Sequence, residues 1–128
     1  MIEPLVGSDS YQIATKLLDA VALRQEALAS NIANAETPGY KRVDLAPAFL
    51  DQLRASVARG DLASAGPALQ PTLAPDEHAR SVRPDGNSVE TEHELAEMNR
   101  NSVEHGFLTE IVSTNLRQLR MAITGKSA

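Results

Sequence analysis

The residues of this sequence best suited to chemistry lie in the segment HELAE, residues 93–97. Zinc-binding helices of proteases begin in this way, but a second histidine must follow four positions after the first, so that both imidazoles face the metal. Here that position is Glu97, while His78 and His105 stand elsewhere in the chain. We therefore predict no metal site and interpret the segment as a solvated, charged helix face.

Other arrangements that support catalysis are also absent from the sequence. The chain has no cysteine, no Gly-x-Ser-x-Gly nucleophile turn and no glycine-rich phosphate loop. Its carboxylates cluster where helix N-termini favour negative charge, so no acid–base pair is needed to explain them. We interpret His105 as a histidine at a helix interface. The sequence thus predicts a protein that is not an enzyme, with no catalytic residues, no cofactor and no small-molecule substrate.

Charge and composition narrow the class of protein further. The 128 residues carry a formal net charge of −5, and their basic side chains are scattered. Nucleic-acid binders usually present a clustered basic face, so we predict no nucleic-acid partner. No apolar run approaches the roughly 20 residues of a membrane span. The first ten residues lack the features of a cleavable signal, so any route out of the cytoplasm is expected to need none.

Two long periodic segments must position whatever function the chain has. The first runs from about Asp9 to Asn34, with Asp9 and Gln12 in the pattern of a helix N-terminal capping box. Along it a stripe recurs with alternating gaps of four and three, as on a helix that lies nearly parallel to a partner helix. The stripe consists of Ala14, Leu18, Val21, Gln25, Leu28, Ile32 and Ala35.

The second periodic segment begins near Asn87, where Asn87 and Glu90 form another capping-box pattern, and it ends near Gly125. Acidic residues crowd its first turns and arginines its last, as the helix dipole favours. Gly106 in its middle should cost roughly 1 kcal/mol relative to alanine, which a kink or a close neighbouring backbone could offset. Its stripe consists of Leu95, Met98, Ser102, His105, Thr109, Val112, Leu116, Leu119 and Ile123, flanked by Val103, Phe107 and Ile111.

The middle of the chain has a different character. Residues 46–60 predict a short helix, with Pro47 in its first turn and Gly60 at its end. Residues 60–86 contain four prolines and three glycines, a composition that predicts a mobile or extended excursion. Within it, residues 78–83 are expected to form a short strand.

These elements predict a mostly all-α fold, with two long antiparallel terminal helices in a coiled-coil-like hairpin and a small irregular, Pro/Gly-rich insert. We divide the chain into an N-terminal helix with a Pro-Gly turn (1–43), a short helix with the irregular insert (44–86), and a C-terminal helix (87–128). The two ends are expected to form one discontinuous helical domain. The expected helix-packing residues are Leu18, Val21, Leu28, Ile32, Leu95, Met98, Val112, Leu116, Leu119 and Ile123.

The stretch NIANAETPGYKR, residues 31–42, ends the first helix. Pro38 cannot continue a helix, and Pro38-Gly39 suits the two central positions of a type II turn, where the glycine takes positive φ. Asn31 and Asn34 lie one turn apart at the helix end, where carbonyls need donors, and they could also bond the returning chain. We therefore predict a sharply defined helix exit that directs the chain after it.

Residues 28–42, LASNIANAETPGYKR, resemble the N-terminal motif shared by the axial proteins of the bacterial flagellum, which are its rod, hook and hook-associated subunits. Residues 85–125 resemble the C-terminal region of one branch, the proximal rod (FlgB) family of basal-body rod proteins, and the short middle fits that family too. This sequence has His105 where the family often has an aromatic residue. The residues that carry the resemblance are Asn31, Ile32, Asn34, Pro38, Gly39 and Tyr40 in the first region, with Asp85, Gly86, Asn87, Val89 and Asn101 in the second.

The resemblance implies a structural subunit of the proximal rod, which polymerises through its terminal helices and forms part of the drive shaft that transmits torque. It implies as partners other rod subunits and further copies of the chain, the adaptor at the rod base and the MS ring. It also implies export, unfolded, through the flagellar type III apparatus without a cleavable signal peptide, and a place in the periplasmic rod of the basal body.

Two other interpretations remain open at this point. A helical-hairpin adaptor or export chaperone would use the same apolar helix faces to bind one partner. Another short rod subunit of the same family would share much of the motif. A rod subunit makes heterologous contacts that repeat along a helix, whereas an adaptor forms a closed dimer or a one-to-one complex.

Overall fold

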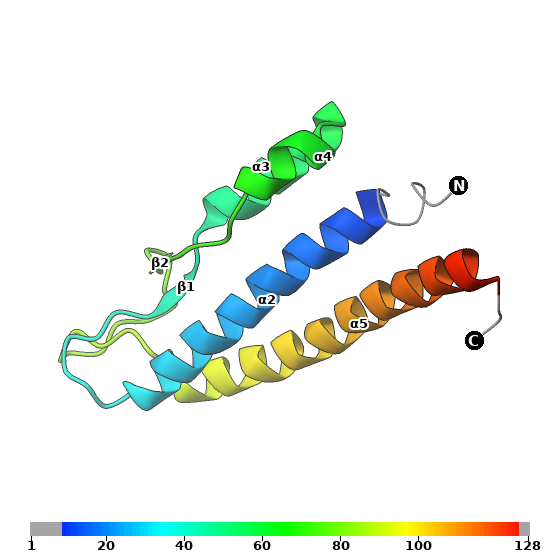
Figure 1. Cartoon of the computed structure of the whole chain (residues 1–128). Coiled ribbons are helices and arrows are strands. Elements are labelled where there is room, and N and C mark those ends of the chain that lie inside the picture. Colours follow the sequence, from blue (N-terminus) through cyan, green and yellow to red (C-terminus); the bar gives the residue numbers. More distant parts are fainter. Residues whose placement is uncertain (1–8, 126–128) are drawn as a thin grey trace.

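The computed structural model describes residues 9–125. Two long helices, α2 (Asp9–Ala33) and α5 (Thr91–Thr124), run side by side in opposite directions (Figure 1). The prediction of a mostly helical chain with long N- and C-terminal helices is confirmed. Between these helices lie β1 (Val43–Leu45), α3 (Pro47–Arg59), α4 (Leu62–Ala65), the 3-10 turn η1 (Gly66–Ala68) and β2 (Leu73–Pro75).

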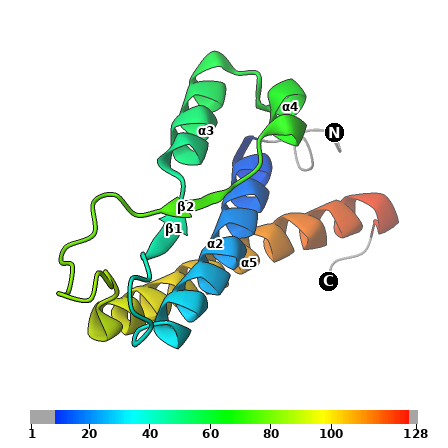
Figure 2. The same ribbon diagram turned by 90° about the vertical axis from the view of Figure 1, so that its left-hand side faces the viewer.

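Helix α2 is the central element, with α5 on one side and the α3–α4 layer on the other (Figures 1 and 2). Two small apolar clusters join these layers. On the α5 side, Ala14 and Val21 pack against Leu108. The other cluster places Ala20 against buried side chains from α3, α4 and η1, which are Phe49, Leu53, Leu62 and Leu69.

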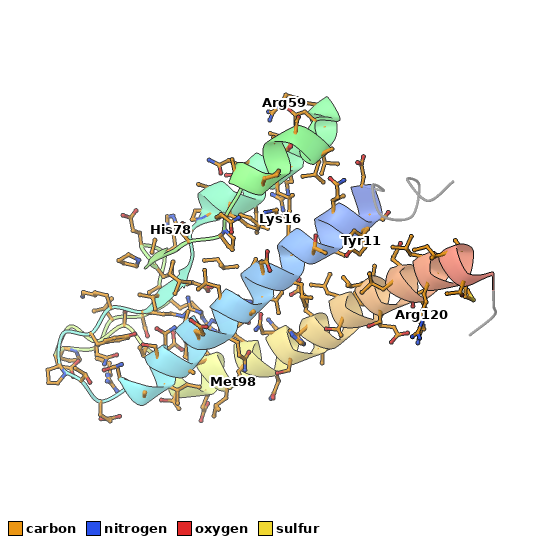
Figure 3. All side chains as sticks on the ribbon, in the orientation of Figure 1. Tyr11, Lys16, Arg59, His78, Met98 and Arg120 are labelled. Atoms are coloured by element: carbon orange, nitrogen blue, oxygen red, sulfur yellow. The ribbon has the colours of Figure 1, made fainter. Side chains whose placement is uncertain are left out.

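The connecting segment is more ordered than its composition predicts. Leu62 and Leu69 are buried in the cluster on α2, and Lys16 of α2 donates a hydrogen bond to the Leu69 carbonyl at 2.9 Å (Figure 3). These anchors hold the chain between its prolines, so the Pro/Gly content does not produce an irregular excursion throughout. α3 begins at Pro47, and Gly60 ends it in the left-handed conformation, as predicted.

The expected strand at residues 78–83 is wrong. The strand lies earlier, at β2, which pairs antiparallel with β1 so that Leu73 stands opposite Leu45. Residues after Asp76 leave the ladder, and the Arg83 amide bonds to the Asn87 carbonyl at 2.8 Å, which folds this part of the chain into a turn.

The predicted capping box at the start of the second long helix is also wrong. Helix α5 begins at Thr91, and Glu90 precedes it in an extended conformation without a side-chain cap. The Asn87 side chain is unavailable because it bonds to another part of the chain, described below. Asp9, predicted to cap the first long helix, is the first helical residue of α2, and the residue before it lies outside the described residues.

The predicted packing stripe on α5 is displaced by one residue in its first half. Leu95 is 48% exposed, whereas Glu94 and Asn101 are buried. The partner groups on α2 are polar there, so the polar side chains turn inward and the contact is not the apolar coiled-coil seam that we expected. Among the other expected packing residues, Val21 and Leu28 are buried, Leu116 and Ile123 are exposed, and Leu18, Ile32, Met98, Val112 and Leu119 are half-buried.

None of the helices in residues 9–125 has both the length and the apolar character needed to cross a lipid bilayer.

Candidate functional site

The candidate site is the corner where the chain leaves α2, and it begins with a tight turn. Gly39 has φ of 74°, and the Tyr40 amide bonds to the Thr37 carbonyl at 3.2 Å. Pro38 followed by a glycine with positive φ, in a turn that this hydrogen bond closes, has the features of a type II turn. The turn sends the chain back along α2 toward β1.

Asn31, at the end of α2, holds the returning chain. Its side chain is fully buried, and it accepts a hydrogen bond from the Val43 amide at 2.9 Å while donating to the Val43 carbonyl at 2.8 Å. Its amide also donates to Glu94 of α5 at 3.0 Å, and its oxygen receives the Tyr40 hydroxyl at 3.2 Å. Asn31 thus acts as a strand partner for β1 and joins it to both long helices.

Asn87, from a distant part of the sequence, holds the turn that follows α2. Its side chain is fully buried, and its amide nitrogen donates to three carbonyls at 3.0, 3.1 and 2.8 Å, those of Asn34, Ala35 and Thr37. Its oxygen accepts the Val89 amide at 2.8 Å. These carbonyls belong to the turn that follows α2, and each also accepts a second hydrogen bond, from the Thr37 amide, the Arg83 guanidinium and the Tyr40 amide respectively. Asn87 therefore ties this turn to the start of the C-terminal region.

Two glycines with positive φ, Gly39 and Gly86, lie where the two chain segments meet. The Gly39 amide bonds to the Asp85 carbonyl at 2.9 Å, and the Ser88 amide bonds to the Tyr40 carbonyl at 3.1 Å. A Cβ atom on Gly86 would lie 3.4 Å from the Gly39 Cα. The regions around residues 31–40 and 85–89, which are far apart in sequence, therefore form one structure.

A network of charged side chains lies directly beside this corner. The buried Arg42 guanidinium pairs with Glu94, and it also contacts Asp44 at 3.0 Å and Asp76 at 2.9 Å. Arg24 of α2 bridges Asp44 at 2.8 Å and Glu97 of α5 at 3.0 Å. These pairs connect α2, α5 and the β1–β2 ribbon to one another.

The charges in the network stabilise one another. Burial alone would raise the pKa of Asp44, but the hydrogen bond and charge of Arg24 outweigh it and lower that pKa. The pKa of Glu97 is lowered in the same way, with Arg24 again opposing the effect of burial. Burial would lower the pKa of Arg42, yet Glu94 and Asp44 raise it. Asp44 and Glu97 are therefore ionised at neutral pH, and Arg42 is held firmly as a cation.

The corner brings together most, but not all, of the residues that carry the family resemblance. Asn101 lies further along the contact between α2 and α5, where its amide donates to the Val21 carbonyl at 2.9 Å and to Gln25 at 2.7 Å. Ile32 is half-buried and Pro38 is exposed. The members that meet at the corner are Asn31, Asn34, Gly39, Tyr40, Asp85, Gly86, Asn87 and Val89.

Sequence reasoning did not find the charged network. Its members are Arg24, Arg42, Asp44, Asp76, Glu94 and Glu97. A stripe built from apolar residues passes over charged ones, although Glu94, Glu97, Asn101 and Leu108 also follow helical spacing. A helical stripe that counts charged residues together with apolar ones would have identified this face of α5.

This arrangement is suited to holding segments of the chain in place. Glu97, which the zinc-protease comparison singled out, is engaged by Arg24 at 3.0 Å and Arg100 at 2.8 Å. Across residues 9–125, no group of three or more His, Asp or Glu side chains is placed to hold a metal ion. The chemistry of the corner is hydrogen bonding and ion pairing within the protein.

Comparison with known proteins gives two kinds of match. Residues 14–41 match the family described as flagella basal body rod protein. That range contains most of α2 and the turn that follows it.

Individual relatives match over most of their length. The chain is 32% identical to the flagellar basal body rod protein FlgB of Yersinia enterocolitica, over 82% of this chain and 85% of the relative. It is 30% identical to the protein of the same name from Escherichia coli, over 91% and 93%. The corresponding Salmonella typhimurium protein is 29% identical, over 84% and 88%.

Proposed function

Because the chain belongs to the FlgB family of flagellar basal body rod proteins, we propose that it is a structural subunit of the proximal rod and polymerises through its two terminal helices. The family is one of structural proteins of the flagellum, and assembly with other rod components in the basal body follows from membership. In this role the subunit forms part of the shaft that transmits torque.

The observation that carries the polymerisation proposal is the set of large apolar side chains that α5 exposes. Val103 is 75% exposed, Phe107 67% and Ile123 65%. Solvent-facing side chains of this size along a single helix are typical of surfaces that other proteins cover. Helices gain most of their stability from packing, so copies that cover these faces would stabilise α5 as well as join the subunits.

The corner is proposed to set the direction in which the insert leaves the helical layer. Asn87 and Asn31 hold the return of the chain on both sides of the turn, and the Arg42 network fixes β1 and β2 against the helices. A stiff corner transmits load between the helical layer and the insert without bending, which is what a rotating shaft requires.

We further propose the finer features that the resemblance implies. The partners are other rod subunits, further copies of this chain, the adaptor at the rod base and the MS ring. The subunit reaches the periplasmic rod through the flagellar type III export apparatus without a cleavable signal peptide.

Deletion of the gene tests this function. The strain is expected to be non-motile and to lack assembled rods, and a plasmid copy should restore both. Basal bodies purified from the complemented strain should contain the chain by immunoblot. A motile deletion strain, or basal bodies that lack the chain while motility is restored, would refute the rod assignment and favour an export chaperone or adaptor.

A further inference from the structure

One apolar patch on α5 faces away from α2. Val103 and Phe107 lie one turn apart and are 75% and 67% exposed, and together with Asn99, Arg100 and Glu104 they line a shallow depression. We call this the middle patch. Gly106 beside it has open space where a side chain would be, although α5 is an unbroken helix there. Nothing within residues 9–125 therefore accounts for a glycine at this position.

A second apolar patch lies toward the end of α5. Leu116 and Ile123, which we call the end patch, are 48% and 65% exposed. They continue the side of the helix on which Leu108 and Val112 pack against α2, because α5 extends beyond the start of α2 (Figures 1 and 2). The end patch is thus an extension of an existing helix contact that the described chain leaves uncovered.

The two patches cannot meet within one chain. Phe107 and Ile123 stand 16 residues apart on one continuous helix, which corresponds to about 24 Å along the axis and about 160° around it. Any contact between the middle patch and the end patch must therefore join two copies.

The unpaired charges beside the patches are complementary. Arg100 and Glu104 both border the middle patch, but Arg100 is paired with Glu97 at 2.8 Å. Arg120 lies near the end patch on the side of α5 turned away from α2 (Figure 3). Neither Glu104 nor Arg120 forms an ion pair within residues 9–125, in contrast to the nearby pair Arg117–Glu110 at 3.1 Å. A cation and an anion that the described part of the chain leaves unpaired, each beside an apolar patch, favour contact between unlike patches over contact between like ones.

We propose that the end patch of one copy packs on the middle patch of the next, with Arg120 facing Glu104 and the second helix lying close over Gly106. This inference rests on the proposed function and identifies a surface through which copies meet. Because the two patches differ, the contact is heterologous and leaves one patch of each kind free at the ends, so it extends into a filament.

Disulfide cross-linking tests the pairing, because the chain has no cysteine of its own. The double variant Phe107→Cys/Ile123→Cys is assembled into basal bodies, oxidised, and separated on a non-reducing gel. A ladder of dimers, trimers and larger products is expected, whereas each single variant should stay monomeric. Dimers from Phe107→Cys alone, or a double variant that incorporates but yields no ladder, would overturn the inference while leaving the rod assignment intact.

A charge exchange tests the same pairing without relying on cysteines. Glu104→Arg and Arg120→Glu are each expected to lower the amount of chain in purified basal bodies several-fold, and the double exchange should restore it. Arg54→Glu, on the exposed surface of α3, serves as the control and should have no effect. A double variant that incorporates no better than the single ones contradicts the pairing. If the unaltered chain were absent from basal bodies, that result would instead contradict the proposed function and this inference with it.

Discussion

Replacing Asn87 with alanine tests the corner most sharply. The buried side chain supplies two N–H donors to three carbonyls and one acceptor to the Val89 amide. That amounts to about three hydrogen bonds at about 1 kcal/mol each. Asn87→Ala should therefore lower the free energy of unfolding by about 3 kcal/mol, a large share of the roughly 5–15 kcal/mol typical of a folded domain.

Asn87→Asp should be more harmful than Asn87→Ala. The aspartate has nearly the same shape, but it would place a buried carboxylate against three carbonyl oxygens and remove both donors. An unpaired buried charge costs more than a lost hydrogen bond. Asn99→Ala, at an exposed position of α5, serves as the control and should leave stability nearly unchanged, because alanine is the better helix former.

Urea unfolding of the purified chain, followed by circular dichroism, measures these differences. Hydrogen exchange adds a local readout, because the Val89 and Gly39 amides bond within the corner and should exchange faster in Asn87→Ala. A loss below about 1 kcal/mol, or unchanged exchange at both amides, would show that Asn87 does not hold the turn that follows α2.

Three further predictions follow from the geometry. Gly39→Val should destabilise the chain by about 1–3 kcal/mol in the same urea assay, because a β-branched residue resists the φ of 74° found there; the asparagine variant should cost less. Gly106→Ala should stabilise the isolated chain by up to about 1 kcal/mol yet reduce its incorporation into basal bodies, since the added methyl group would obstruct a close neighbour. Stability should fall as pH drops below about 4, the ordinary range of carboxyl pKa values, because the lowered pKa values of Asp44 and Glu97 contribute stability only while these groups are ionised.

Each of these predictions has a clear contrary result. A valine variant as stable as the asparagine variant would show that residue 39 does not need positive φ. If Gly106→Ala instead improved incorporation into basal bodies, no neighbouring helix could lie close over position 106. For the pH prediction, Asp44→Asn and Glu97→Gln should be less stable than the original chain at neutral pH and lose less on acidification. If these variants lost as much stability on acidification as the original chain, the pH dependence would come from other groups. Glu104→Gln, at an exposed position, is the matched control.

The parts of the fold governed by local rules were predictable. Hydrophobic periodicity located α2 and α5, and Pro47 and Gly60 marked the ends of α3. Pro38-Gly39 marked the turn because local backbone preferences decide its geometry. Elements of this kind depend on neighbours in the sequence, which the sequence displays directly.

The parts that depend on distant partners were not predictable. Asn87 matches an N-terminal cap for the helix that follows it, yet its side chain bonds the turn after the first long helix, where Thr37 lies 50 residues earlier. In the sequence Arg42 is one of several scattered basic residues, whereas in the structure three carboxylates from different segments surround it. In both cases the outcome depends on which polar groups become buried together, and tertiary packing decides that.

The central claim is that neighbouring copies in the rod cover the apolar faces that α5 leaves open. Thiol reactivity of Phe107→Cys, compared between the purified chain and purified basal bodies, tests it most directly. The account predicts rapid labelling in the purified chain and strong protection in basal bodies, while Arg54→Cys, whose native side chain is 78% exposed, should react similarly in both. Equal labelling of position 107 in the two preparations would contradict the account.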